Sequence, residues 1–450
     1  MKPKQVTIVG AGLTGPLLAL MLARRGFSVT LCERRPDPRI GRVEAGRSIN
    51  LALSARGIRP LERAGVYAEV EPRLIPLRGR LVHERSGEPA LQPYGQRAGE
   101  VIYSVGRAEL NRVLIEAAGR AGAELRFAQR CLGLDPAGGH LLLQDEQSGR
   151  KYDTVPDAVI AADGAGSTLR ATLEAAGAAA VRIEPLDHGY KEMTLPPAAG
   201  RHALEPGALH IWPRGGFMLI ALPNPDGSFT MTLFLAHQGE QSFTALAEDC
   251  VAERFFTEQF PDLRPYLPHL LGDFCRNPEG RLATVHTAGW HLGGKALLLG
   301  DAAHAIVPFH GQGMNAGFED CALFDDLLEQ CDGWEEVFRR FERLRRPDTE
   351  AIAQMALENY LEMRDSVRDP GFLQRKRLAF ALEKRFPDRF IPRYSMVMFH
   401  PEISYLEALR RGQRQLAILE ELDRRRTPSG GIDCTLAQAL VRERLPSLGS

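Results

Sequence analysis

The sequence lacks the features that mark membrane-spanning, disulfide-rich, zinc-binding or nucleic-acid-binding proteins. No run of 18 apolar residues occurs, so no membrane-spanning helix is expected. The formal net charge is -1, which gives no reason to expect a polyanionic partner. The seven cysteines are odd in number and form no CxxC pair, which favours reduced thiols over disulfides or a zinc site. We therefore expect a cytoplasmic protein with no bound metal, no nucleic-acid partner and no membrane anchor.

The glycine-rich segment at residues 5–36 is the most informative feature that is present. An apolar run leads into Gly10, Gly12 and Gly15, a helical stretch follows, and a second apolar run ends at Glu33. In a dinucleotide site the first glycine makes a tight turn, the second admits the pyrophosphate, and the third lets helix and strand pack closely. The helix N-terminus favours the phosphate anion, and Glu33 is spaced to bind ribose hydroxyls. The segment predicts a dinucleotide site; a glycine-rich turn without a ligand is the alternative.

A second segment, at residues 297–318, indicates that the dinucleotide is FAD. A buried strand ends at Gly300-Asp301, a loop rich in proline and glycine follows, and a helix begins near Met314. The carboxylate of Asp301 can accept hydrogen bonds from the ribityl hydroxyls of FAD. A helix that starts at Gly313, Met314 and Asn315 points backbone N–H groups at the charge of the reduced flavin ring. The alternative is a strand, turn and helix in which Asp301 is only a cap.

A third segment, at residues 158–170, is another apolar strand that closes on Asp163 and leads into a helix containing Arg170. The three segments in this order resemble the flavoprotein aromatic hydroxylases, the single-component FAD monooxygenases related to p-hydroxybenzoate hydroxylase. In that family the middle motif lies where the flavin and NADPH surfaces meet, whereas Asp163 taken alone reads as a helix cap. Only one GxGxxG motif occurs, so NADPH is expected to dock transiently.

The predicted fold class is α/β with an α+β substrate region, and 450 residues with 44% hydrophobic content allow two or three domains. Two apolar runs on either side of Asn224-Pro225-Asp226-Gly227 predict a hairpin in an antiparallel sheet. A charged, periodic helical stretch begins near residue 335 and is predicted to break at Pro347, and residues 427–431 (TPSGG) are expected to form a flexible link. The predicted parts are a discontinuous Rossmann-type FAD-binding domain (1–180 and 281–345), a β-sheet substrate domain (181–280) and a C-terminal helical region (346–450).

Further segments narrow the resemblance to the kynurenine 3-monooxygenases over about residues 1–400. They are GRSINLALSARG (46–57), RGRLVH (78–83), LQPYG (91–95), HGYKEM (188–193), HIWPRGGFMLIALPN (210–224), GDAAHAIVPFHGQGMNAGFEDC (300–321), ALENYLEM (356–363) and FIPRYSMV (390–397). The resemblance implies tight, non-covalent FAD and the hydroxylation of L-kynurenine to 3-hydroxy-L-kynurenine with NADPH and O2. The expected oxidant is a flavin C4a-hydroperoxide, which attacks the electron-rich ring carbon beside the amine and needs no strong protein base. The expected protein is a monomer or homodimer.

The resemblance also implies a set of substrate-binding residues. Arg80 matches the arginine that pairs with the substrate carboxylate, and its planar fork suits that task. The positions that match hydrogen-bonding partners of the amino-acid end are Tyr94, Asn359 and Tyr394. His310 is expected beside the flavin and Phe234 against the substrate ring. Without the resemblance, Arg80 reads as a surface salt-bridge partner and the aromatic residues as core.

On the cofactor side, the resemblance adds residues around the glycine motif. Leu13 and Thr14 join the glycines at the pyrophosphate, and Arg34 and Arg35 flank Glu33 near the adenosine. Cys131 is expected to contribute a backbone contact to adenine, and the FAD groove is expected to be lined by Arg47, Ala52 and Arg107. The alternative for Arg107 is an exposed helix arginine.

Two other functions stay open at this point. One is an FAD hydroxylase for a different small aromatic acid, and the other is a non-catalytic flavin-binding redox sensor. Identifying which aromatic compound accelerates NADPH oxidation distinguishes the first function from kynurenine hydroxylation. Failure of NADPH to reduce the flavin with any aromatic acid indicates the second.

Overall fold

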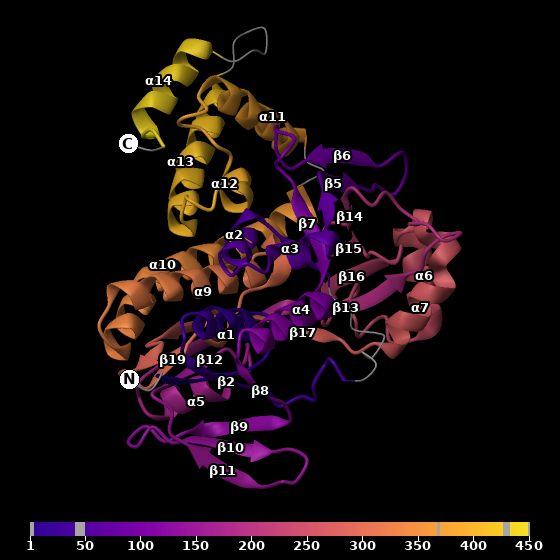
Figure 1. Cartoon of the computed structure of the whole chain (residues 1–450). Helices are drawn as coiled ribbons and strands as arrows, with labels where there is room; N and C mark the ends of the chain where they lie inside the picture. The colour runs from indigo at the N-terminus through magenta and orange to yellow at the C-terminus, as the bar shows by residue number, and fades with distance from the viewer. Residues whose placement is uncertain (1–3, 41–49, 367–369, 426–432, 449–450) are drawn as a thin grey trace.

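The computed structural model describes residues 4–40, 50–366, 370–425 and 433–448 (Figure 1). The position of Arg47 and the predicted link at 427–431 lie outside these described residues. Within them, no helix is long and apolar enough to cross a membrane. Among the described residues, no three His, Cys, Asp or Glu side chains are placed so that they could hold a metal ion.

A six-stranded sheet carries the glycine motif. Its strand order is β18 (His291–Leu292), β19 (Ala296–Leu298), β12 (Ala158–Ala161), β1 (Gln5–Val9), β2 (Ser28–Cys32) and β8 (Glu124–Arg126). All neighbours are parallel except β18 and β19, and every residue of β12 is buried, as expected for a parallel sheet covered on both faces. Strands from three distant parts of the chain therefore form the predicted Rossmann-type sheet.

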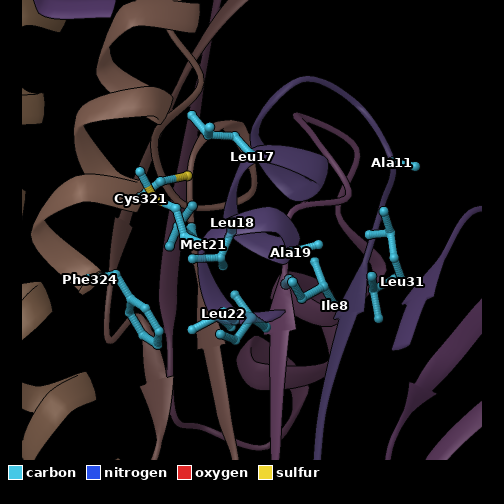
Figure 2. Close-up of a cluster of buried hydrophobic side chains, with 14 of the residues drawn as sticks. Ile8, Ala11, Leu17, Leu18, Ala19, Met21, Leu22, Leu31, Cys321 and Phe324 are labelled. Carbon is cyan, nitrogen blue, oxygen red and sulfur yellow. The ribbon is translucent and has the colours of Figure 1, made fainter. Parts of the chain in front are cut away.

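Helix α1 (Thr14–Arg24) packs on β1 and β2, and helices α4 (Arg107–Arg120) and α9 (Gly313–Gln330) pack against α1. Figure 2 shows part of the shared core: Leu18 and Leu22 of α1 lie between Ile8 of β1 and Phe324 of α9. These side chains are all buried, so apolar burial holds the first 30 residues against a helix almost 300 residues later. The predicted helix start near Met314 is confirmed.

A seven-stranded sheet forms the second layer. Its order is β17 (Gly280–Ala288), β13 (Ala180–Leu195), β16 (Phe229–Ala236), β15 (Met218–Pro223), β14 (Leu209–Pro213), β5 (Gly79–Val82) and β6 (Ala90–Pro93). Only β14 and β5 pair in parallel. The predicted hairpin is confirmed, because β15 and β16 are antiparallel on either side of the turn at residues 224–228. The first apolar run divides into β14 and β15 at Gly215 and Gly216, whose φ angles are +62° and +119°.

Two strands of this sheet, β5 and β6, come from residues 79–93, within the part of the chain assigned above to FAD binding. The sheet is covered on its outer face by α6 (Asp249–Gln259), the 3-10 helix η2 (Pro261–Tyr266) and α7 (Leu267–Arg276). The domain boundaries at residues 180, 280 and 345 stay a prediction.

Smaller elements complete the two layers. One three-stranded sheet consists of β9 (Gln129–Leu134), β10 (Leu141–Asp145) and β11 (Lys151–Thr154), and another of β3 (Asn50–Leu53), β7 (Ile102–Gly106) and β4 (Ile75–Leu77). The short helices are α2 (Ala55–Arg63), α3 (Tyr67–Val70), η1 (Glu71–Arg73), α5 (Thr168–Ala175), α8 (Asp301–His304) and η3 (Pro308–His310).

The C-terminal part is helical, as predicted, with α10 (Trp334–Leu361), the π-helical turn η4 (Glu362–Ser366), α11 (Pro370–Arg385), α12 (Arg393–Phe399), α13 (Tyr405–Arg424) and α14 (Cys434–Arg444). The predicted break at Pro347 is wrong, because α10 continues through it. An internal proline costs a helix about 3 kcal/mol. Buried neighbours offset that cost: Phe341 and Ile352 are fully buried, and Arg345 forms an ion pair with Asp320 of α9.

Candidate active site

A cavity of about 390 Å3 lies between the two large sheets. It begins at the glycine motif with Gly12, Leu13 and Thr14, and it passes Asp301 at the start of α8. Strands β14, β15 and β16 form one wall, and Arg80 and Tyr394 lie among the lining residues. The predicted residues that line it are Gly12, Leu13, Thr14, Ala52, Arg80, Tyr94, Arg107, Phe234, Asp301, His310, Gly313, Met314 and Tyr394.

The glycine motif adopts a conformation that side chains would prevent. Gly10 has φ +104°, and a Cβ atom there would lie 2.4 Å from the carbonyl oxygen of Ala162. A Cβ on Gly15 would lie 2.0 Å from the carbonyl oxygen of Gly10. From α4, the Nδ2 atom of Asn111 donates to the carbonyls of Ala11 and Gly12, at 3.0 and 2.6 Å. The loop therefore lies closely between Ala162 and Asn111, with its backbone against the cavity.

Glu33 lies at the end of β2, beside the glycine motif. Its Oε2 atom accepts from the backbone N–H of Ala11 at 2.8 Å, and its Oε1 atom accepts from Nε of Arg35 at 2.8 Å. Burial alone would raise the pKa of Glu33, but the bonds from Arg35 and Ala11 lower it, so the side chain is a carboxylate. The backbone N–H of Gln129 donates to the carbonyl of Glu33 at 2.8 Å, which places Cys131 of β9 nearby. Glu33, Arg34, Arg35 and Cys131 are not among the cavity-lining residues.

The turn that carries Asp301 is fixed by Asp320, a fully buried residue of α9. Oδ2 of Asp320 accepts from the backbone N–H of Gly300 at 2.9 Å and faces Nε2 of His304 at 2.7 Å. Burial would raise the pKa of Asp320, but His304 and Arg345 lower it to about 2. The charge of Asp320 is therefore neutralised locally, and the side chain of Asp301 is left facing the cavity.

Asn315 does not line the cavity but holds neighbouring backbone segments together by hydrogen bonds. Its Oδ1 atom accepts from the backbone N–H of Ser54, and its Nδ2 atom donates to the carbonyls of Ala52 and Gly311, at 3.0, 2.9 and 2.8 Å. These bonds hold β3 beside the first turn of α9.

Asp163 takes part in capping α5, the alternative considered for this residue. Its Oδ2 atom accepts from the backbone N–H of Thr168 at 2.8 Å, and Ser167 is the N-cap of the helix. Burial raises the pKa of Asp163. Its neighbours Ala162 and Gly164 line the cavity.

These residues fit an FAD molecule. The backbone N–H groups at the start of α1 and the side chain of Arg107 suit an anionic pyrophosphate. Asp301 supplies an acceptor for the ribityl hydroxyls, and the first turn of α9, at Gly313 and Met314, follows it along the cavity. The cradle of backbone at Gly10 and Gly15 is the form that a dinucleotide requires.

The far end of the cavity is built around Arg80, which lies on β5 and is 5% exposed. Its Nη2 atom donates to Oδ1 of Asn359 at 3.2 Å, and its Nη1 atom lies 3.1 Å from Oε1 of Glu362. The guanidinium lies over the rings of Tyr94 and Tyr394, at 5.9 and 5.0 Å from their centroids. Burial would lower the pKa of Arg80, but Tyr394 and Glu362 raise it, so the group is a cation.

Four residues that the sequence analysis drew from distant segments are therefore brought together. The rings of Tyr94 and Tyr394 stack at 5.3 Å, and burial raises the pKa of both hydroxyls. Nδ2 of Asn359 donates to the carbonyl of Phe309 at 2.7 Å, which fixes its oxygen toward Arg80. Asn359 supports the cavity from behind Arg80 and does not itself line it.

His310 and Phe234 both reach the cavity. His310 stacks on Tyr394 at 5.5 Å, and burial lowers its pKa to about 3, so the ring is neutral. Its Nδ1 atom has no hydrogen-bond partner among the described residues. Phe234 of β16 packs against Phe309 at 4.9 Å.

Three residues that matter to this geometry were missed by the sequence analysis. Glu362 follows Asn359 by three residues, Asn111 follows Arg107 by four, and Asp320 lies seven residues after Gly313. Spacings of three, four and seven place side chains on one helix face, and that signal could have identified all three.

Comparisons with known proteins identify the fold and the family. Residues 4–356 match the FAD binding domain family. The fold is similar to that of 2-methyl-3-hydroxypyridine-5-carboxylic acid oxygenase, with TM-score 0.67 and 19% identity over 83% of this chain and 96% of that one. It is also similar to PqsL of P. aeruginosa, solved in complex with 2-aminobenzoylacetate, with TM-score 0.65 and 21% identity over 82% and 99% of the two chains. The fold and the site define an FAD-binding protein of the monooxygenase type.

Closer relatives specify the family. The chain is 46% identical to a kynurenine 3-monooxygenase of Stenotrophomonas maltophilia over 99% of this chain and 98% of that protein. It is 47% identical to a kynurenine 3-monooxygenase of Myxococcus xanthus over 98% and 95% of the two chains. The chain belongs to the kynurenine 3-monooxygenase family and is an FAD-dependent monooxygenase.

Proposed function

We propose that this enzyme hydroxylates L-kynurenine to 3-hydroxy-L-kynurenine, with NADPH and O2 as co-substrates. The observation that carries the proposal is Arg80, a buried cation at the wall of the cavity beside the stacked rings of Tyr94 and Tyr394. A buried guanidinium at the end of an apolar cavity suits a small aromatic compound with a carboxylate on its side chain.

The amino-acid end of kynurenine has both a carboxylate and an ammonium group. Arg80 pairs with the carboxylate, and the acceptor oxygens of Asn359 and Glu362, 3.2 and 3.1 Å from Arg80, hold its guanidinium in place from behind the cavity wall. The hydroxyl groups of Tyr94 and Tyr394 stay protonated, because burial raises their pKa, and can donate to the carboxylate.

The aromatic ring of the substrate then lies along the wall formed by Leu209, Met218 and Phe234, which are all buried. This orientation directs the ring toward the flavin end of the cavity, where Gly313 and Met314 begin α9. The apolar wall excludes water and holds the ring carbon in line for oxygen transfer.

FAD, held by the glycine motif, Arg107 and Asp301, supplies the redox chemistry when it is bound. In the net reaction, one oxygen atom of O2 enters the C–H bond beside the aniline nitrogen, and the other leaves as water with the hydride of NADPH and a proton. The protein is not required to supply a strong base, and His310, whose pKa burial lowers to about 3, is a weak base.

The test is to purify the protein with its flavin and follow NADPH oxidation with and without L-kynurenine. We expect acceleration by L-kynurenine and a product heavier by one oxygen atom. Faster turnover of another aromatic acid would instead indicate a different hydroxylase. A flavin that NADPH does not reduce with any aromatic acid would indicate a redox sensor.

A further inference from the structure

A cluster of two histidines, a tryptophan and an aspartate lies behind the substrate wall. Along β14, Leu209 and Ile211 pack on the cavity side, whereas Trp212 packs in the core on the outer face of the sheet. Nε2 of His83, which directly follows β5, lies 2.8 Å from Nδ1 of His210 on β14. None of these outer residues is used by the proposed chemistry.

Asp262 of η2 anchors this cluster from outside the sheet. Its Oδ2 atom accepts from Nε1 of Trp212 at 2.8 Å and faces Nδ1 of His83 at 2.9 Å. The ring of Trp212 stacks on that of His83 with 4.1 Å between centroids. At the other end, Nε2 of His210 faces the carbonyl oxygen of Glu205 at 2.8 Å.

The contacts fix the number of protons on the two histidines. A carbonyl can only accept, so Nε2 of His210 carries a proton, and the carboxylate of Asp262 requires a proton on Nδ1 of His83. The 2.8 Å contact between the rings needs a third proton. Two neutral rings carry only two such protons, so the pair holds one more and has a positive charge.

The surrounding charges agree with this count. Burial lowers the pKa of His210 to about 4, so His210 disfavours carrying the extra charge itself. Burial alone would raise the pKa of Asp262, but His83 and Trp212 lower it, so Asp262 is the counter-charge. The other charged groups at the cluster are the carboxylate of Glu205, near His210, and Arg214, which donates to the carbonyl of His83 at 2.9 Å.

The cluster joins the two strands that set the position of Arg80. β5 has only four residues and pairs with β14 by the register Arg80 to Leu209 and Leu81 to His210. His83 lies three residues after Arg80, and its backbone N–H donates to the carbonyl of Ile211 at 2.9 Å. The side-chain contact between His83 and His210 is a second interaction between the end of β5 and β14.

We infer that His83, His210 and Asp262 form a proton-sharing clamp that positions Arg80 for the substrate carboxylate. They are positioning residues, because none of them lines the cavity. The inference rests on the proposed function, in which Arg80 binds that carboxylate.

The clamp is tested with Asp262→Asn. Asparagine keeps the shape and one acceptor oxygen but removes the counter-charge, so the pair loses its extra proton and two ring lone pairs face each other. We expect L-kynurenine to bind at least tenfold more weakly, while kynuramine, which lacks the carboxylate, binds as it does to the unmodified enzyme. FAD content should not change. His83→Gln provides a second variant, with the same expectation.

Lys191→Met is the matched control. Lys191 lies on β13 of the same sheet, and its Nζ atom donates to the carbonyl of Phe274 in the outer layer at 2.8 Å. Because β13 is distant from β5 in the strand order, this variant should bind both ligands normally.

Nitrogen NMR of labelled histidine in the unmodified holoenzyme tests the proton count directly. We expect an imidazolium signal at pH 7 that is lost both in Asp262→Asn and in His83→Gln, which assigns it to the His83–His210 pair. Two neutral rings in the unmodified enzyme, unchanged kynurenine binding in both variants, or equal weakening for both ligands would each overturn the clamp. If Arg80→Met also leaves kynurenine binding unchanged, the assignment of Arg80 in the proposed function is wrong as well.

Discussion

Replacing Arg80 by methionine tests the proposed substrate site most directly. Methionine keeps much of the stem but removes the charge and the hydrogen-bonding fork. Truncating one partner of a buried, hydrogen-bonded charge pair costs about 2 to 5 kcal/mol. Since about 1.4 kcal/mol corresponds to a tenfold change in affinity, L-kynurenine should bind roughly 30-fold to several thousand-fold more weakly. Glu362, 3.1 Å from Arg80, would remain near the substrate carboxylate as a like charge, and this repulsion should increase the loss of affinity.

The assay is a titration of the flavin absorbance with L-kynurenine and, separately, with kynuramine. Kynuramine has no carboxylate, so it should bind the variant and the unmodified enzyme about equally, and FAD content should stay normal. Arg78→Met is the matched control, because Arg78 lies two residues earlier and is exposed. Unchanged binding of L-kynurenine to Arg80→Met would refute the reasoning and require another site for the carboxylate.

Three other predictions concern the cofactor and pH. Asp301→Ala removes an acceptor of charge-assisted hydrogen bonds, on the order of 1.5 to 3 kcal/mol each, so the purified variant should lose much of its FAD; full flavin content with unchanged affinity would show that Asp301 is only a cap. Heat denaturation should release a yellow flavin that chromatographs as FAD, and recovery of FMN or of flavin attached to the polypeptide would contradict non-covalent FAD binding. The pKa of His310 is lowered to about 3, so the folded state holds the neutral ring while the unfolded state gains a proton below about pH 6.5. His310 therefore makes stability fall as pH falls from about 6.5 to 3, by up to about 1.4 kcal/mol per pH unit, and His310→Phe should reduce this slope in denaturant titrations.

The elements that the sequence predicted well are those fixed by local chemistry. Only glycine fits at positions 10 and 15, because a Cβ atom there would lie within 2.4 Å of a backbone carbonyl oxygen. Glycines at that spacing between two apolar runs are typical of a dinucleotide-binding turn. The hairpin after Pro223 follows in the same way from turn residues between two strands.

The features that the sequence did not predict depend on contacts between distant segments. Pro347 is a local helix breaker, yet the ion pair of Arg345 with Asp320 and the packing of α10 outweigh it. The short strand β5 has no strong pattern of its own, and it is placed by backbone pairing with β14, a strand far along the chain. The pairing of Arg80 with Glu362 also could not be read from either segment alone.

The distribution of charge along the cavity links the cofactor and substrate halves of the proposal. In the proposed arrangement, the anionic group of each ligand lies at an opposite end, the pyrophosphate near Arg107 and the carboxylate at Arg80. The wall between those ends includes Leu209, Phe234 and Met398, which are all buried. Because each charge is held at its own end, the flavin and the aromatic ring meet in the apolar part of the cavity. A buried apolar wall disfavours water at that point, and this favours oxygen transfer to the substrate over loss of the activated oxygen as hydrogen peroxide.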